Sequence, residues 1–386
     1  MSDIQPFRVD VPEHVLADLR ERLARTRWPE PVPGTGWDAG TDTGFLRELC
    51  AYWADGYDWR AHEARLNAYP QFVTEIDGQR VHFLHVRSAN PDAIPLLVCH
   101  GWPGSVVEFL RIVEPLTAAG PDAFHLVIPS LPGYGWSSPV ADAGWHPVRM
   151  ARAFAELMAR LGYGRYAAQG GDWGSVVATE LALAEPDKVI GIHLNLVIAG
   201  PGPDDDPADF TDAERASLGR MRALGRTEAG YLRLQASKPY TLGHALTDSP
   251  AGLASWIVEK FRGWSDCGGD VLSRFDRDDL LTNITVYWAT GTAHSSARLY
   301  YENAVAAADG SMPQPRPRVE VPTGYAYFPA EQLGTPSPRW ARRRYNITRF
   351  TEMPSGGHFA AMEEPELLVE DVRAFFRPLR DAPGTP

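Results

Sequence analysis

The chain begins with two helical patterns separated by a turn. Apolar residues recur at helical spacing from Val15 until Pro29 interrupts the pattern. A Pro- and Gly-rich turn over 29–44 follows, and residues 45–59 again show helical spacing, with many aromatic side chains. Two alternating runs on either side of Asp77-Gly78 predict a hairpin over 72–86. We therefore expect an N-terminal arm that packs on the rest of the protein.

Short apolar runs then alternate with helical patterns. The runs are typical of buried parallel strands and lie at 95–99, 125–128, 166–169 and 189–196. Helices are predicted between them at 106–116, 147–161 and 174–184. This order of elements predicts an α/β fold with a mainly parallel sheet.

The alternation stops near 201–207, and residues 208–310 have a mainly helical pattern. A Pro-rich stretch over 312–322 ends this block, after which strands are predicted at 325–328 and 346–350 and a last helix at 366–379. A helical insertion thus splits the sheet. We divide the chain into an arm with the first hairpin (1–90), an α/β core (91–200 and 318–386) and a helical cap (201–317).

Composition narrows the classes of function. Hydrophobic residues make up 44% of the 386 residues and charged residues 22%, so the chain can bury a large core. The net charge of −12 disfavours nucleic acid as a partner, and we expect a small-molecule substrate. The three cysteines are Cys50, Cys99 and Cys267. Their odd number and wide spacing predict neither a disulfide framework nor a metal knuckle, and favour a reducing cytoplasm.

The N-terminal residues lack the apolar run of a signal peptide, and no stretch of the sequence is apolar enough for a membrane span. We therefore expect an unprocessed protein without a membrane anchor. The sequence contains no dinucleotide or phosphate-loop fingerprint, which predicts chemistry without a cofactor.

The sharpest local motif is Gln169-Gly170-Gly171-Asp172-Trp173-Gly174-Ser175, between a predicted strand and a predicted helix. It fits the small-x-nucleophile-x-small pattern of a nucleophile elbow, in which glycines relieve crowding at a sharp turn. The apex residue is Asp172, and a carboxylate at this place can attack an electrophilic carbon and form an ester. The alternative is that Asp172 only caps the following helix.

A second motif, His100-Gly101-Trp102-Pro103-Gly104-Ser105, follows an early strand. Its backbone N–H groups, together with that of the residue after the nucleophile, can form an oxyanion hole. Trp102 and Trp173 are the candidate donors. The alternative is an ordinary Gly/Pro turn.

The third motif supplies a base and its partner. His358 lies in a Gly-rich loop after the last predicted strand, and Glu331 follows the strand before it. A neutral imidazole can act as a general base, and a carboxylate can orient it. The order nucleophile, acid, histidine is that of α/β-hydrolases. Taken singly, His358 and Glu331 are more often surface residues, but the joint order favours a triad.

Other polar residues have simpler interpretations. Ser175 and Ser105 are poorly placed for a serine triad. His193 lies in an apolar run, as a hydrogen-bonded core residue does. The carboxylates of the segments 204–207 (DDDP) and 276–279 (DRDD) are expected in solvated loops rather than in a metal site, so no metal is predicted.

The chain resembles the microsomal-type epoxide hydrolases of the α/β-hydrolase superfamily over nearly its whole length. The segments that carry the resemblance are RTRWPE, HGWPGS, LPGYGWS, GGDWGS, LLTNITVYWATGT, FPAE and GGHFAAMEEPELLVEDVRAFF. The resemblance implies that Asp172 is the nucleophile, His358 the base and Glu331 its partner. It also implies two cap tyrosines that bind the epoxide oxygen, Tyr231 and Tyr300, with Tyr301 as the alternative to Tyr300.

The expected reaction is hydrolysis of an epoxide to a vicinal diol through an ester on Asp172. Two alternatives stay open: a dehalogenase with the same triad, which would need halide donors in place of the tyrosines, and a ligand-binding protein without catalysis. Related bacterial proteins without membrane anchors include enzymes that act on aryl epoxides in natural-product pathways, including antibiotic pathways such as enediyne biosynthesis. A bulky or aryl epoxide is therefore the expected substrate, and the oligomeric state is left open.

Overall fold

One nine-stranded sheet organises the chain in the computed structural model, which describes residues 3–312 and 316–380. The strand order is β1-β2-β3-β5-β4-β6-β7-β8-β9. The strands are β1 (Gln5–Phe7), β2 (Gln71–Ile76), β3 (Gln79–Val86), β4 (Ile94–Cys99), β5 (Phe124–Pro129), β6 (Tyr166–Gly170), β7 (Val189–Leu194), β8 (Val319–Tyr327) and β9 (Tyr345–Glu352).

The sheet has an antiparallel and a parallel part. The predicted hairpin is confirmed as β2 and β3, whose two-residue turn places Asp77 and Gly78 at φ 52° and 73°. The pairs β4–β5, β4–β6, β6–β7, β7–β8 and β8–β9 are all parallel. The carboxyl ends of these strands therefore meet at one edge of the sheet, where their loops can share a site.

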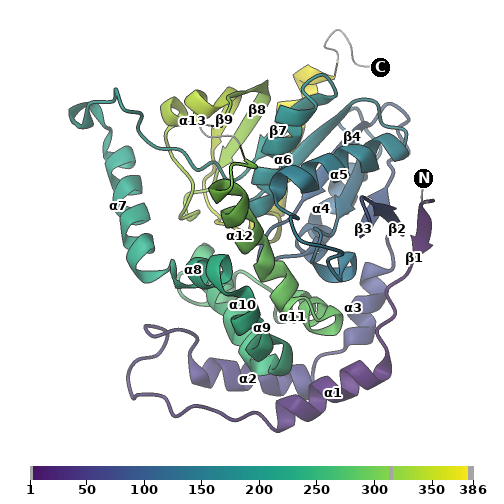
Figure 1. Cartoon of the computed structure of the whole chain (residues 1–386), viewed down its shortest axis with the longest axis vertical. Coiled ribbons are helices and arrows are strands. Elements are labelled where there is room, and N and C mark those ends of the chain that lie inside the picture. The colour runs from purple at the N-terminus through teal and green to yellow at the C-terminus, as the bar shows by residue number, and fades with distance from the viewer. Residues whose placement is uncertain (1–2, 313–315, 381–386) are drawn as a thin grey trace.

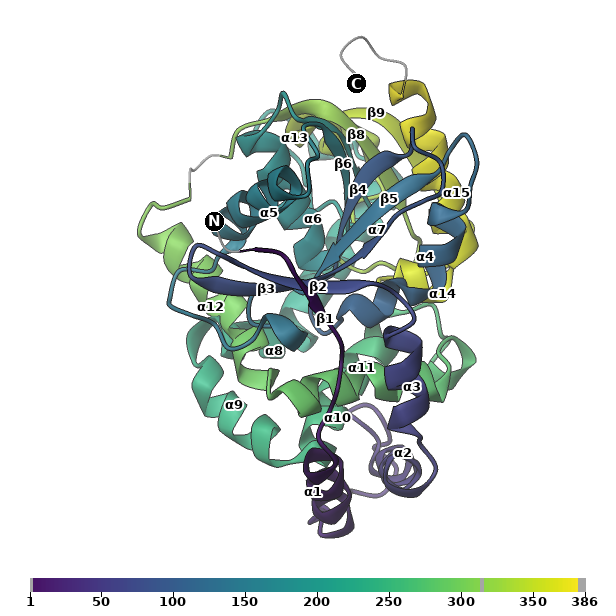
Figure 2. The ribbon, with the colours of Figure 1, turned by 90° about the vertical axis from the view of Figure 1, so that its right-hand side faces the viewer.

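Helices cover both faces of the sheet, which explains why strands such as β7 consist entirely of buried residues. Figure 2 shows α5 and α6 on one side and α4 and α15 on the other. The helical elements of the core are η1 (Val106–Phe109), α4 (Leu110–Thr117), η2 (Gly135–Ser137), α5 (Pro147–Arg160), α6 (Asp172–Ala184), α13 (Pro338–Arg344), α14 (Ala360–Glu363), α15 (Pro365–Phe376) and η5 (Arg377–Leu379).

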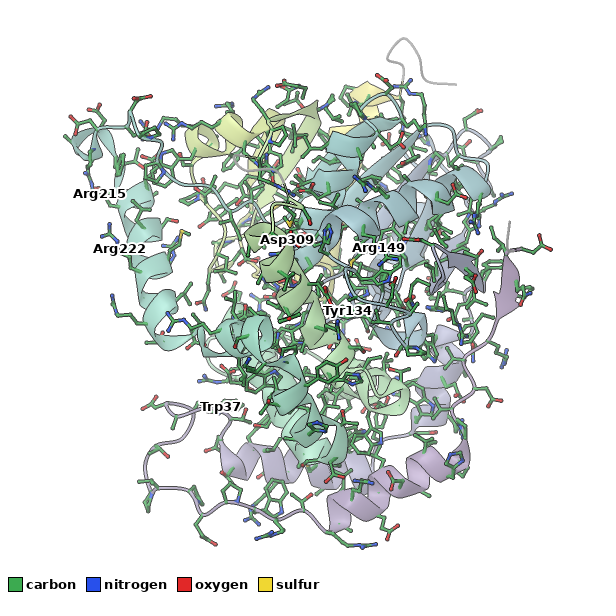
Figure 3. All side chains as sticks on the ribbon, in the orientation of Figure 1. Trp37, Tyr134, Arg149, Arg215, Arg222 and Asp309 are labelled. Atoms are coloured by element: carbon green, nitrogen blue, oxygen red, sulfur yellow. The ribbon has the colours of Figure 1, made fainter. Side chains whose placement is uncertain are left out.

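The helical block lies between β7 and β8 and forms a cap below the sheet (Figure 1). Tyr134 lies where core and cap meet, whereas Arg215 and Arg222 lie along α7 at the outer edge of the molecule (Figure 3). The elements of the cap are η3 (Pro207–Asp209), α7 (Asp212–Thr227), α8 (Gly230–Ser237), α9 (Pro239–Asp248), α10 (Pro250–Trp264), η4 (Val271–Ser273), α11 (Arg277–Thr290) and α12 (Ala293–Ala308).

The N-terminal arm joins core and cap. It contributes β1 to the sheet, passes beneath the cap as α1 (Glu13–Ala24) and α2 (Thr43–Asp55), and returns toward the sheet beside α11 as α3 (Trp59–Leu66) (Figure 1). The indole of Trp53 donates a hydrogen bond to Thr285 in α11 at 2.9 Å, and the hydroxyls of Tyr57 and Thr282 also lie 2.9 Å apart. These buried bonds fix the arm against the cap.

Two sequence expectations were wrong. β8 begins at Val319, inside the predicted Pro-rich break, because Pro322 lies at an irregularity in the pairing with β9, where a missing N–H is tolerated. Asp279 is buried rather than solvated, and it forms ion pairs with Arg65 of the arm and Arg111 of the core. Parts of the predicted break (313–315) and of the C-terminal core (381–386) lie outside the described residues.

Candidate active site

The turn between β6 and α6 holds Asp172 in a strained conformation. Its φ is 48°, which is uncommon for a residue other than glycine. A Cβ added at Gly170 would overlap the backbone of Gly174, and one added at Gly174 would overlap the carbonyl oxygen of Cys99. Only glycine fits at these two positions, so the small residues of the motif allow the sharp turn that presents Asp172.

The carboxylate of Asp172 faces the loop after β4. Its Oδ1 accepts a hydrogen bond of 2.8 Å from the backbone N–H of Trp102. The capping alternative is wrong, because Gly171 is the N-cap residue of α6 and Asp172 already belongs to its first turn. The amide of Trp173, in the same turn, makes no hydrogen bond with another described residue. Trp102 therefore occupies the predicted donor position, and the Trp173 amide is free to donate.

His358 links Asp172 to Glu331. Its Nδ1 lies 2.7 Å from Oε2 of Glu331, and its Nε2 lies 3.3 Å from Oδ2 of Asp172. The second oxygen of Glu331 accepts a hydrogen bond from the backbone of Leu333, which fixes the carboxylate. The backbone N–H of His358 donates to the carbonyl of Trp264 in the cap. The structure thus brings together the three predicted triad residues, which follow β6, β8 and β9 in the chain.

The protonation of His358 depends on its two carboxylates. Burial alone would lower the pKa of His358, but the negative charges of Glu331 and Asp172 raise that pKa well above its usual value. The imidazole is therefore protonated while both carboxylates are ionised. Loss of the charge on Asp172 lowers the pKa of His358 and makes a neutral base available.

Two tyrosines of the cap lie near Asp172. The ring of Tyr231 stacks on that of Trp102 with 5.2 Å between centroids, and the ring of Tyr300 meets Trp173 edge-on at 4.9 Å. The two tyrosine rings are 5.9 Å apart. Tyr300 is buried, whereas Tyr301 is 37% exposed, so Tyr300 is the residue that faces the site.

Burial also keeps both phenols protonated. It raises the pKa of Tyr231, and the charge of Asp172 adds to this effect while the hydroxyl of Tyr300 opposes it. The pKa of Tyr300 is raised well above its usual value for the same main reason, with Tyr231 and Asp172 adding to it. Two neutral O–H groups therefore lie close enough to Asp172 to be affected by its charge.

An apolar cavity leads to this site. It has a volume of about 160 Å³ and reaches Tyr231, Trp264 and His358 from an apolar wall in α7 and α8. That wall consists of Met221, Leu224 and Leu232. A hollow of about 300 Å³ shares Leu224, Glu228 and Gln332 with it. Trp37, Arg220 and Arg262 lie at the outer side of this hollow.

Other candidates do not form a site. The hydroxyl of Ser175 donates to Gly170, and that of Ser105 donates to Asn283, so neither serves His358. His193 is a core residue as predicted, since its Nε2 lies 3.0 Å from Asp371. Among the described residues, no cluster of three His, Cys, Asp or Glu side chains could hold a metal ion.

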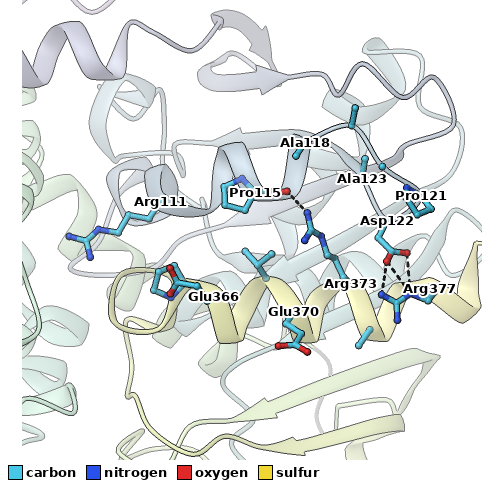
Figure 4. Close-up of a pocket in the computed structure, with 15 residues that line it drawn as sticks. Arg111, Pro115, Ala118, Pro121, Asp122, Ala123, Glu366, Glu370, Arg373 and Arg377 are labelled. Carbon is cyan, nitrogen blue, oxygen red and sulfur yellow. Dashed lines mark hydrogen bonds and ion pairs between the residues drawn. The ribbon is translucent and has the colours of Figure 1, made fainter.

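A wide groove of about 600 Å³ lies between α4 and α15 (Figure 4). It shares no lining residue with the triad or the tyrosines. Its cationic groups already have partners, because Arg377 forms an ion pair with Asp122 and Arg373 donates to the carbonyl of Pro115. The candidate active site is therefore the cluster beneath the cap and not this groove.

Sequence reasoning missed Trp264 and Lys260 of α10. Trp264 contacts the ring of His358 at 4.9 Å, and the ammonium of Lys260 lies 4.7 Å from the ring centroid of Tyr231. Lys260 is only 4% exposed and pairs with Glu228 and Glu259. A lysine and a tryptophan at helical spacing carry no motif that would have identified them.

The sheet, the strained turn at Asp172 and the Asp-His-Glu arrangement define an α/β-hydrolase. A carboxylate occupies the position at which this fold carries its nucleophile. A family model described as "alpha/beta hydrolase fold" matches residues 94–235, and one described as "Epoxide hydrolase N terminus" matches residues 4–109. In the described residues no helix is both long and apolar enough to cross a membrane.

Individual relatives show to which family of α/β-hydrolases the chain belongs. A Stigmatella aurantiaca protein assigned to the epoxide hydrolases is 44% identical over 98% of this chain and 86% of its own length. Epoxide hydrolase 1 of Oryctolagus cuniculus is 37% identical over 97% and 89%. The crystal structure of juvenile hormone epoxide hydrolase from the silkworm Bombyx mori superimposes with a TM-score of 0.90 at 33% identity, covering 98% of this chain and 95% of that one. The chain belongs to the epoxide hydrolase family and hydrolyses epoxides.

Proposed function

We propose that the enzyme opens its epoxide in two steps through an ester on Asp172. The observation that carries the proposal is the position of the carboxylate, with Oδ1 on the Trp102 N–H and Oδ2 beside His358. One oxygen is thus held in the oxyanion position while the other attacks an epoxide carbon. Tyr231 and Tyr300 lie on the cap side, where their O–H groups donate to the epoxide oxygen as its bond to carbon breaks.

In the second step, water attacks the acyl carbon of the ester. Formation of the ester removes the charge of Asp172, so the pKa of His358 falls and its proton replaces the one that a phenol gave to the epoxide oxygen. The neutral Nε2 then accepts a proton from water. Glu331 holds Nδ1 at 2.7 Å and stabilises the imidazolium. The N–H groups of Trp102 and Trp173 donate to the oxyanion. As the oxyanion collapses, the bond to the diol oxygen breaks, the remaining proton of the attacking water passes to that oxygen, and the carboxylate is restored.

The cavity supports an apolar substrate. Its wall of Met221, Leu224 and Leu232 offers few polar partners, and Tyr231 and Trp264 add aromatic surface. We propose a bulky or aryl epoxide from natural-product metabolism, such as antibiotic biosynthesis, and a cytoplasmic enzyme, in keeping with three buried cysteines without disulfides. Rates with styrene oxides and with short aliphatic epoxides test this choice. Equal kcat/KM for both classes would contradict it.

Replacement of the base tests the two-step route. In His358→Gln the carboxylate of Asp172 still attacks, but no group activates water, so the ester accumulates. Mass analysis after incubation with an epoxide is expected to find one substrate mass on the peptide that contains Asp172. The double variant Asp172→Ala/His358→Gln is the matched control and stays unmodified. An unmodified Asp172 peptide in His358→Gln would contradict the route.

A further inference from the structure

Glu108 is an acidic residue close to the triad that the reaction described above does not use. It lies in η1, directly after the loop that holds Trp102. Its side chain folds back over that loop, because a Cβ added at Gly104 would overlap Oε1 of Glu108. The carboxyl group makes no hydrogen bond or ion pair with another described residue. A carboxyl group inside a protein is energetically costly unless it forms a hydrogen bond, so we expect a partner for Glu108.

A small polar cavity lies beside this carboxyl group. It has a volume of about 10 Å³, and its lining includes Glu108, Asp172, His358 and Gln169. A volume on the order of 10–15 Å³ holds a single water molecule when two or more polar groups surround it. Oε1 of Gln169 is buried without a partner among the described residues, although its amide nitrogen donates to Asn195 at 2.9 Å. Two side chains with unused hydrogen-bonding capacity therefore meet in a space of the size of one water.

We propose that this cavity holds the water that hydrolyses the ester, and that Glu108 positions it. One O–H of the water donates to Nε2 of His358, and the other donates to a carboxyl oxygen of Glu108 or to Oε1 of Gln169. The water oxygen then faces the acyl carbon of Asp172. During attack the first proton passes to His358 and the second stays on the oxygen, so Glu108 gains and loses no proton.

The position of Glu108 suits a role in the second step, and its protonation depends on the groups around it. Burial raises the pKa of Glu108 to about 8, the charge of His358 acts to lower it, and that of Asp172 raises it further. Tyr287 in α11 lies close enough for the charge of Glu108 to raise the pKa of its phenol, but its hydroxyl donates to the carbonyl of Gly104 at 2.7 Å. Esterification removes the charge of Asp172 and leaves His358 neutral, and these two changes act on the pKa of Glu108 in opposite directions. Tyr231 and Tyr300, which bind the epoxide oxygen in the proposed first step, do not line this cavity.

The inference rests on the two-step route, and measurement of the two steps separately tests it. Single turnovers with excess enzyme are quenched at short times, and the ester and the diol are quantified. In Glu108→Gln we expect the rate of ester formation to stay within about twofold and the rate of ester hydrolysis to fall on the order of 10- to 100-fold, as misplaced reactants do. Glu114→Gln, at an exposed position of α4, is the matched control and changes neither rate.

The outcomes separate the two proposals. Unchanged ester hydrolysis in Glu108→Gln, or equal slowing of both steps, would overturn the role of Glu108 while the ester route stands. Absence of ester even in His358→Gln would overturn the route and the role together. If Glu108→Gln does not fold, a crystal structure of the wild-type enzyme decides, since we expect a water within hydrogen-bond distance of Glu108 and His358. A cavity without water would contradict the inference.

Discussion

Core and cap hold their reactive groups in different ways. In the core, Asp172, His358 and Glu331 follow three parallel strands and are joined by contacts of 2.7 and 3.3 Å. In the cap, Tyr231 and Tyr300 lie on helices and are placed by aromatic rings. The centroid of Tyr231 lies 5.2 Å from that of Trp102, and the centroid of Tyr300 lies 4.9 Å from that of Trp173. The backbone thus positions the triad, whereas packing positions the phenols. We therefore expect substitutions in the core triad to lower reaction rates more than substitutions of cap residues do.

Glu331→Gln is expected to have the largest effect. The amide can still contact Nδ1 of His358, but the charge that stabilises the imidazolium is gone, so ester hydrolysis should slow by about 10²–10⁴-fold. Rapid-quench measurement of diol release checks this, with circular dichroism to confirm the fold. Glu302→Gln is the control, because Glu302 pairs with Arg298 and not with the triad. Near-normal turnover in Glu331→Gln, together with loss of turnover in Glu302→Gln, would assign the role of the acid to Glu302 instead of Glu331.

The phenols should affect the first step by a smaller amount. Tyr231→Phe or Tyr300→Phe removes one donor to the epoxide oxygen and should slow ester formation by about 10²–10³-fold. The rate of ester hydrolysis should stay near that of the wild type. Tyr301→Phe is a matched control in the next position of the same helix, and its side chain is 37% exposed. A silent Tyr300→Phe together with a slow Tyr301→Phe would contradict the assignment.

Lys260→Met should have the smallest effect. The ammonium lies 4.7 Å from the centroid of Tyr231 and stabilises negative charge that develops on the phenol as it donates its proton. We expect ester formation to slow by about 10-fold or less, and the charge-conserving variant Lys260→Arg to recover most of the rate. Equal losses in both variants would indicate that Lys260 only packs against the ring.

The same contrast explains what the sequence could predict. Asp172, His358 and Glu331 follow strands in a fixed order, so local motifs and chain order indicated them. Tyr231 and Tyr300 came only from the family resemblance, because a tyrosine at helical spacing is usually a core residue. Glu108 and Lys260 have no motif, and only the folded chain shows what surrounds them.

Elements that depend on distant partners were harder to predict. Asp279 looks like part of a solvated charged run, but Arg65 meets it from 214 residues away in the chain. β8 begins in a Pro-rich stretch because a strand neighbour, β9, tolerates Pro322 at an irregular pair. Hydrophobic periodicity reports local structure, and it contains no information about either partner.

The origin of the new diol oxygen distinguishes attack by Asp172 from direct attack by water. In a single turnover with excess enzyme in ¹⁸O water, we expect an unlabelled first diol, because its new oxygen comes from the carboxylate of Asp172. Peptide mass analysis should then find ¹⁸O in the peptide that contains Asp172. A labelled diol in the first turnover, with no ¹⁸O at Asp172, would show that water attacks the epoxide directly and would contradict the ester on Asp172.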